Sequence, residues 1–200
     1  MPKAPPVCIP RCSNYLHRLD RTHRETEETI MSRRIPEPTL WLSAAGFIAT
    51  AVSFGPGRMG FGLFLPTFRE EFALSSTVAG LMASFGFLGF LLALPLTAWL
   101  VGRTGQRLPV MLGVLCATGG FLAVASATDS ATLAAGIALA GASGGFCWAP
   151  FNDAAERVVP ERVRPGALSA VSTGTTLGVA AAGALFLGVS AGAFDWRMAW

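Results

Sequence analysis

Long runs without a single charged residue constrain the fold of this chain more than any other feature of its sequence. Five such runs, each of 20 or more residues, cover 38–57, 72–102, 108–128, 130–152 and 165–194. A bilayer core about 30 Å thick needs roughly 20 helical residues, and in lipid a helix satisfies its own backbone hydrogen bonds. We therefore expect an all-α integral membrane protein with five transmembrane helices.

The expected helices extend approximately over residues 41–66, 78–101, 108–128, 131–151 and 167–190. Glycine and alanine are frequent in them, and such small residues let helix backbones approach closely where lipid gives no hydrophobic drive for association. Two G-x-x-x-G pairs are Gly141 with Gly145 and Gly174 with Gly178. They favour packing inside a bundle without indicating a particular partner.

Basic residues near the ends of the expected helices are divided unequally between the two sides of the membrane. If the N-terminus is cytoplasmic, that side receives 12 of these Lys and Arg residues and the outer side only Arg69 and Arg197. Cytoplasmic loops carry the excess of Lys and Arg in membrane proteins. We therefore expect a multi-pass protein of a bacterial inner or plasma membrane with a cytoplasmic N-terminus. Topology then explains the net charge of +3, so we expect no nucleic acid partner.

Residues 1–40 differ from the rest because they mix Arg, Glu, Pro and Ser and lack an apolar core. Such a composition does not bury enough surface to fold, so we expect a flexible cytoplasmic tail. Met31 would be an alternative start of translation. Four potential metal ligands in this tail are Cys8, Cys12, His17 and His23. Their spacing is too short and too polar for the usual zinc module, so we expect neither a metal site nor a cofactor.

The turn between the second and third expected helices reads AWLVGRTGQR, residues 98–107. It is short and basic, and Gly105 can adopt the positive φ that a tight reversal requires. The segment resembles the signature G-x-x-x-D-R-x-G-R-R/K that transporters of the major facilitator superfamily carry at this cytoplasmic turn. The matching residues are Arg103, Gly105 and Arg107, and the departures are Ala98, Gly102 and Gln106. In the family, the carboxylate at the position of Gly102 helps to latch the two transporter halves.

The segment DWRMAW, residues 195–200, carries a second resemblance. It is similar to the W-R-x-x-[WF] pattern with which this superfamily enters its sixth helix. Together with the segments between these two motifs, the resemblance covers residues 41–200. It implies a secondary transporter of twelve helices in two halves, of which this chain would be an N-terminal fragment. Its partners would be the lipid bilayer, a small-molecule substrate and the missing C-terminal half.

Arg58 is the charged residue that falls at membrane depth in these helices. It lies 17 residues after Trp41, which is about 25 Å along a helix. Intramembrane charges usually face cavities, which favours substrate binding, and a guanidinium favours an anion such as a small organic carboxylate. The alternative is that Arg58 snorkels to the outer interface. Pro56 removes a backbone hydrogen bond just before it and, between two glycines, is a candidate gating residue.

Further candidates for substrate binding are Trp148, Asn152 and Thr175. Trp148 and Asn152 lie one helical turn apart, and an aromatic ring beside an amide suits an organic ligand, although Trp also anchors helices at the membrane interface. Thr175 offers its hydroxyl either to a substrate or to its own helix. At the cytoplasmic turn the gating candidates are Arg103, Gly105 and Arg107. Asp153 and Glu156, in an expected solvated loop, are candidate ion-pair partners of the two arginines.

Other functions find less support in the residues. A membrane enzyme is not expected, because both histidines lie in the tail and the expected helices contain no Asp or Glu before Asp153. Two alternatives stay open: a drug or cation exporter of the same superfamily, and a non-transporting membrane scaffold or interaction protein. A membrane carboxylate in the other half would indicate the exporter, and measured flux would exclude the scaffold.

Overall fold

The structure is a computed structural model, and it describes residues 37–200. Within this range the long elements are all α-helices and no strand occurs. The elements are, in chain order, α2 (Glu37–Phe54), η1 (Gly55–Met59), α3 (Gly60–Glu71), α4 (Ser76–Thr104), α5 (Arg107–Ala125), α6 (Ser130–Val158), α7 (Arg164–Ser190) and η2 (Trp196–Ala199). Five stretches are long and apolar enough to cross a membrane, the first being Glu37–Glu71, which we call the first span. The predicted all-α membrane fold is confirmed.

Residues 1–36 lie outside the described part of the chain. Most of the predicted tail is therefore not described, and its last four residues, 37–40, belong to α2. The predictions that fall on the undescribed residues are those on Met31, Cys8, Cys12, His17 and His23.

Side-chain interactions support both ends of α6. At its start the carboxylate of Asp129 accepts a hydrogen bond from the backbone amide of Thr132 at 2.9 Å, which is the usual N-cap arrangement. The helix continues to Val158, beyond the expected end at residue 151. There Arg157 donates to the carboxylate of Asp153 at 2.9 Å, and such i,i+4 pairs support a final helical turn. The polar end of this helix therefore extends past the charge-free run that predicted it.

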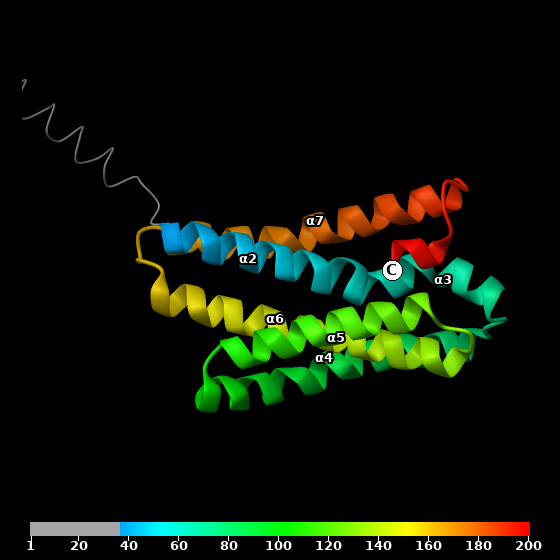
Figure 1. The fold of residues 1–200 in the computed structure, drawn as a ribbon, viewed down its shortest axis with the longest axis horizontal. Coiled ribbons are helices and arrows are strands. Elements are labelled where there is room, and N and C mark those ends of the chain that lie inside the picture. Colours follow the sequence, from blue (N-terminus) through cyan, green and yellow to red (C-terminus); the bar gives the residue numbers. More distant parts are fainter. Residues whose placement is uncertain (1–36) are drawn as a thin grey trace, which may run out of the picture. The chain divides into compact units, whose positions relative to one another are not determined.

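Two groups of helices pack tightly within residues 37–200. α6 packs along α4 and α5, and α2 packs along α7 (Figure 1). Glycines permit the closest approaches. A Cβ at Gly141 would overlap the backbone of Gly86 on α4, and one at Gly178 would overlap the backbone of Ala51 on α2. These contacts confirm that the two glycine pairs serve packing inside the bundle.

Two buried threonines link the paired helices by hydrogen bonds. Thr50 Oγ1 on α2 donates to the carbonyl of Val171 on α7 at 2.7 Å. Thr97 Oγ1 on α4 donates to the carbonyl of Gly145 on α6 at 3.1 Å. Hydroxyl groups at helix interfaces in membranes commonly stabilise association in this way.

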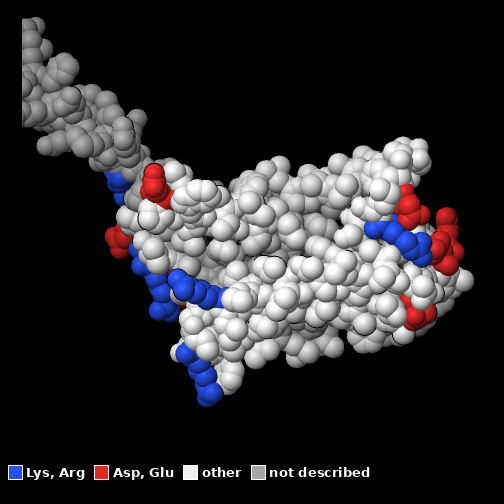
Figure 2. Space-filling model, in the orientation of Figure 1, with Lys and Arg blue, Asp and Glu red and all other residues white. Residues whose placement is uncertain are grey.

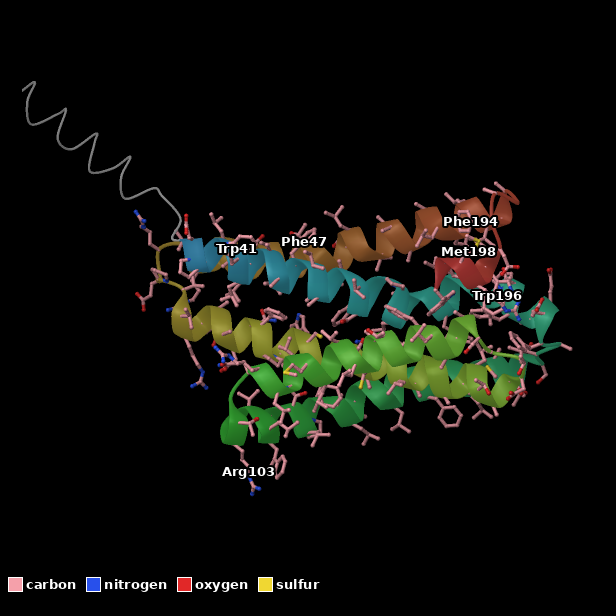
Figure 3. The ribbon with its side chains drawn as sticks, viewed as in Figure 1. Trp41, Phe47, Arg103, Phe194, Trp196 and Met198 are labelled. Carbon is pink, nitrogen blue, oxygen red and sulfur yellow. The ribbon has the colours of Figure 1, made fainter. Side chains whose placement is uncertain are left out.

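Charged side chains gather at the two ends of the helical bundle, and the surface between them is uncharged in the view of Figure 2. Arg103 lies at one end and Trp196 at the other (Figure 3). At the end with Trp196, Arg197 pairs with the carboxylate of Glu71 at 3.1 Å and donates to the carbonyl of Ala127 at 3.2 Å. An apolar belt between two charged ends is the distribution that a bilayer requires.

Candidate functional site

A π-helical turn, η1, interrupts the first span at Gly55–Met59. Pro56 has no amide hydrogen, so it cannot donate the bond to Val52 that a regular α-helix requires. Its neighbour Gly55 lies against α7, where a Cβ would overlap the backbone of Gly178. The sequence indicated an irregularity at Pro56, and the structure gives its form. Single π turns within α-helices occur frequently at functional sites.

Arg58 lies in this π turn, and three phenylalanine rings surround its guanidinium group. The guanidinium carbon is 4.0 Å from the ring centroid of Phe90, 4.8 Å from that of Phe87 and 5.6 Å from that of Phe54. A cation over an aromatic face is attracted by the ring quadrupole, and the attraction is stronger away from water. These three rings therefore offset part of the cost of placing a charge in the span, and we call them the aromatic cage.

The cage does not use the hydrogen-bond donors of Arg58. Its Nε atom is buried and has no hydrogen-bond partner among residues 37–200. In the same part of the chain, the ion pairs of the structure involve other arginines. A guanidinium carries its N–H donors in its plane, and aromatic rings cover its faces. The three rings thus lie close to the guanidinium group, while its buried Nε is left without an acceptor among residues 37–200.

A cavity of about 130 Å³ lies beside Arg58, between the first span, α4 and α6. The residues that line it are Gly57, Arg58, Met59, Phe61, Gly62, Ala83, Gly86, Phe87 and Ile137. Four of them are glycine or alanine, and these small residues create the space. The site therefore combines one permanent positive charge with an otherwise apolar wall.

The sequence singled out Arg58 and Pro56 but did not indicate Phe87 and Phe90 of the aromatic cage. Phe54 lies one helical turn before Arg58, so its proximity follows from helical spacing. Phe87 and Phe90 come from α4, a helix that is apolar on all sides, so its sequence does not show which face meets the first span. The three-residue spacing of Phe87 and Phe90 places both on one face of α4. This spacing was the feature of the sequence that could have indicated a pair of rings on that face.

The other predicted substrate-binding residues lie apart from this cavity. Asn152 donates its side-chain amide to the carbonyl of Trp148 at 2.7 Å, within α6. The Trp148 side chain is exposed, and Thr175 on α7 is half-buried. None of the three lines the cavity at Arg58. The structure thus does not gather the four predicted residues into one site, and the roles of these three stay predictions.

The turn between α4 and α5 has the conformation that its glycine predicted. Gly105 ends α4 with a φ of 75°, in the region that glycine adopts without strain. Arg103 stacks over the ring of Trp99 at 4.2 Å, and Arg107 is the first residue of α5. The carboxylate in this region is Asp153 of α6, which accepts a hydrogen bond at 2.7 Å from the Gln106 side chain.

Asp153 was expected to pair with Arg103 or Arg107. It bonds instead to Gln106, at one of the positions where the turn departs from the family signature, and to Arg157 on its own helix. A carboxylate therefore does contact this turn, although residue 102 is glycine. The family signature drew attention to Arg103 and Arg107, whereas the donor to Asp153 is the side-chain amide of Gln106 between them.

A second, larger hollow lies between α2 and α5 and is also lined by α6. Its volume is about 470 Å³. Its wall includes Ile48, Val52, Val114 and Phe121, and no charged residue lines it. Such a wall suits an apolar side chain or a lipid tail better than a charged solute.

Comparison with known proteins agrees with the resemblance of the sequence motifs. The family model of the Major Facilitator Superfamily matches residues 40–200, which is most of the chain and all five membrane-crossing stretches apart from the first three residues of α2. The chain matches none of the curated proteins with which it was compared. A five-helix membrane bundle with an intramembrane arginine and a family match over this range lead to one assignment: the chain belongs to the Major Facilitator Superfamily.

Proposed function

We propose that this chain is part of a secondary transporter that carries a small organic anion by alternating access, with Arg58 as the residue that binds the anion. The observation that carries the proposal is the buried, unpartnered Nε of Arg58 beside a cavity, within residues 37–200. A guanidinium at the centre of a membrane helix costs about 2.5–3.5 kcal/mol on insertion scales. The aromatic cage offsets part of this cost, and a bound anion would supply the acceptor that the donors lack.

The transport cycle would need a second helical bundle that rocks against this one, as in other secondary transporters. The hollow between α2 and α5 supports the presence of further helices, because its apolar wall is not filled by residues 37–200. Large apolar side chains on α4, such as Leu91 at 61% exposure, also lie uncovered. The proposed partners are thus lipid, a small solute and the remaining helices of the transporter.

The proposed orientation places the N-terminus in the cytoplasm of a bacterial-type cell. The end of the bundle with Arg103 (Figure 3) and the nearby Arg107 would then face inward, in keeping with the excess of Lys and Arg on the cytoplasmic side. At this end Arg103, Gly105 and Arg107 would take part in the inner gate. Pro56 would allow the first span to bend during the cycle.

An exporter of organic cations is the second candidate. Aromatic rings bind cations, so the aromatic cage at Arg58 is the feature that would favour it. However, the guanidinium already occupies these rings at 4.0 and 4.8 Å, and a second cation beside it would be repelled. The arrangement therefore favours an anion. A non-transporting scaffold is the third candidate, and it differs from both by the absence of flux.

The proposal is tested by solute flux. The complete transporter is reconstituted in liposomes, and counterflow is measured with a panel of radiolabelled organic anions and organic cations. We expect counterflow of at least one anion, and we expect Arg58→Ala to abolish it while the variant inserts as well as the wild type. Arg69→Ala, which changes an arginine near the outer end of the first span, is the matched control and should transport normally. Undiminished anion counterflow by Arg58→Ala would overturn the proposal.

A further inference from the structure

We propose that the cavity at Arg58 selects monocarboxylates with a compact, unsubstituted apolar body of about the size of one benzene ring. This inference rests on the proposed transport of an anion and specifies which anions fit. It also assigns Gly62 as a residue that determines the size of the accepted solute. Three features of the cavity carry it: its charge, its polarity and its volume.

The charge of the cavity fits one anionic group. Among the residues 37–200 that line it, Arg58 is the one charged side chain. A single guanidinium can bind one carboxylate through two parallel N–H···O bonds. A second carboxylate on the same solute would enter a wall without another cation, and an unpaired charge in such surroundings is strongly unfavourable. Dicarboxylates and tricarboxylates should therefore be rejected.

The wall of the cavity fits an apolar body. Apart from Arg58, the lining side chains in the described part of the chain are glycine, alanine, methionine, phenylalanine and isoleucine, none of which has a hydroxyl or amide group. A hydroxyl on the solute would lose its bonds to water and gain none from these side chains. Phe61 and Phe87 instead offer ring surface to an apolar solute. Hydroxylated carboxylates should bind more weakly than unsubstituted ones of equal size.

The volume sets the size of that body. The cavity of about 130 Å³ is close to the apolar cavity of about 150 Å³ that takes up benzene in another protein. One ring or a short branched chain would fill the space while the carboxylate reaches the edge of Arg58. Larger aromatic acids should bind more weakly, because a second ring exceeds this volume and would extend out of the partly open cavity.

Gly62 is the position at which this volume can be changed with the least disturbance. It lines the cavity, and a Cβ built on it meets no atom within 4 Å. Gly86 also lines the cavity, but a Cβ there would lie 3.2 Å from the Ile137 side chain. A larger side chain at position 62 should thus occupy solute space without moving the helices. Gly80 on α4 is a matched control, because its Cβ would also meet nothing within 4 Å and it does not line the cavity.

The test measures equilibrium binding of radiolabelled benzoate to the purified complete transporter in detergent. Four compounds serve as competitors. Cyclohexanecarboxylate has the same charge as benzoate and a body of similar size, and terephthalate adds a second carboxylate. Glycerate is small and hydroxylated, and benzyl alcohol is uncharged. We expect cyclohexanecarboxylate to compete within a few-fold of benzoate. The other three should compete at least about tenfold more weakly, as one unpaired polar group or lost charge implies.

Three variants separate the roles of charge and size. Arg58→Gln should weaken benzoate binding at least about tenfold. Gly62→Val should weaken benzoate relative to the smaller propionate by about tenfold, a change in preference that a general loss of folding would not produce. Gly80→Val should leave both affinities unchanged. Elution as a single species in size-exclusion chromatography shows that each variant is folded.

The outcomes of binding and flux are distinct. Benzoate binding that depends on Arg58 and Gly62 supports this inference whether or not flux is observed. If benzoate binds in this way but no solute is transported, only the transport proposal is overturned. Conversely, the site proposed here is wrong if the transporter moves another solute while benzoate neither binds nor competes. It is also wrong if terephthalate or glycerate binds more tightly than benzoate, or if Gly62→Val leaves the preference between benzoate and propionate unchanged.

Discussion

The first span contains Pro56 and Pro66 in its interior and α6 contains Pro150, but the backbone responds differently to Pro56 and Pro150. α6 stays one α-helix of 29 residues through Pro150, whereas the first span changes to a π turn at Pro56. In the most apolar 18-residue stretch of each element, 56% of the stretch is buried in α6 and 28% in the first span. α6 is thus the element on which α4 and α5 pack, and the first span is the less buried element, with Arg58 inside its apolar stretch.

This difference shows that a proline alone does not identify a helix segment that changes conformation. Pro150 is buried and its helix is held on two sides by α4 and α5. Pro56 lies between two glycines and is followed by Arg58, so a missing hydrogen bond, small side chains and a charge within an apolar stretch coincide there. Irregular backbone in a membrane is tolerated where protein or a cavity surrounds it. We therefore infer that α6 is the rigid scaffold and η1 the functional element.

The largest expected effect concerns the scaffold. Gly141→Val should force α6 away from α4, because even a Cβ at this position would overlap the backbone of Gly86. We expect a destabilisation of about 3 kcal/mol or more, seen as a lower midpoint of thermal unfolding in detergent or as loss of the monodisperse protein. Gly183→Val on α7 is the control, since a Cβ there meets nothing within 4 Å. Equal stability of the two variants would show that α4 and α6 are not closely packed.

The next effect concerns the charge in the functional element. Arg58→Lys keeps a cation but loses the planar group that stacks on Phe90 and can bind a carboxylate at two points. We expect the apparent substrate constant for anion uptake to rise about tenfold or more, while membrane insertion stays intact. Uptake kinetics in liposomes provide the measurement. If lysine serves as well as arginine, the residue acts as a simple point charge and the two-point binding is refuted.

A smaller effect should distinguish the two prolines. Pro56→Ala restores an amide hydrogen in the π turn and should let the first span become a regular helix. If this turn bends during transport, the maximal rate of uptake should fall several-fold with little change in substrate affinity. Pro150→Ala in the scaffold should change neither quantity by as much. Equal rates for Pro56→Ala and the wild type would remove the assigned gating role of the turn.

The smallest expected effect is a pH dependence at the start of α6, outside the membrane. The backbone amide and the hydroxyl of Thr132 donate to Asp129 and lower the pKa of its carboxyl. Because the pKa is lower in the folded state, this stabilisation is present above the pKa of the unfolded chain and is lost as pH falls through the folded value. Asp129→Asn keeps a capping oxygen but does not titrate.

The two proteins should therefore have nearly equal unfolding midpoints at pH 7. As the pH is lowered toward 3, the wild type should lose slightly more stability than Asp129→Asn. Identical pH profiles would show that the charge of the Asp129 carboxylate does not contribute to folding.

The sequence predicted most of the fold because a bilayer leaves few choices. A charge-free run of 20 residues in lipid can only be a helix, so all five stretches were found, and Gly105 marked the tight turn after α4. The ends of α6 were less predictable, since Asp153 and Arg157 continue the helix beyond the apolar run. There the polar residues continue the helix, and the pair of Arg157 with Asp153 supports its last turn.

The candidate site was predictable only in part. Arg58 stands out because a charge in an apolar run needs an explanation. Phe87 and Phe90, its neighbours from α4, do not stand out in the sequence. All sides of α4 are equally apolar, and packing against α6 sets the rotation of this helix about its axis. The bond between Asn152 and the Trp148 carbonyl follows the i,i+4 spacing and was within reach of sequence reasoning.

The most direct test of the account is whether the guanidinium of Arg58 faces a cavity that solutes reach. Gly62→Cys, in a background without other cysteines, places a thiol on the cavity wall while Arg58 is retained. Its reaction rates are measured with an anionic and a cationic methanethiosulfonate reagent of similar size, and again with Arg58→Gln added. We predict that the anionic reagent is favoured and that the ratio of the two rates falls about tenfold when Arg58 is replaced. A thiol that reacts with neither reagent, or a ratio that does not depend on Arg58, would contradict the account.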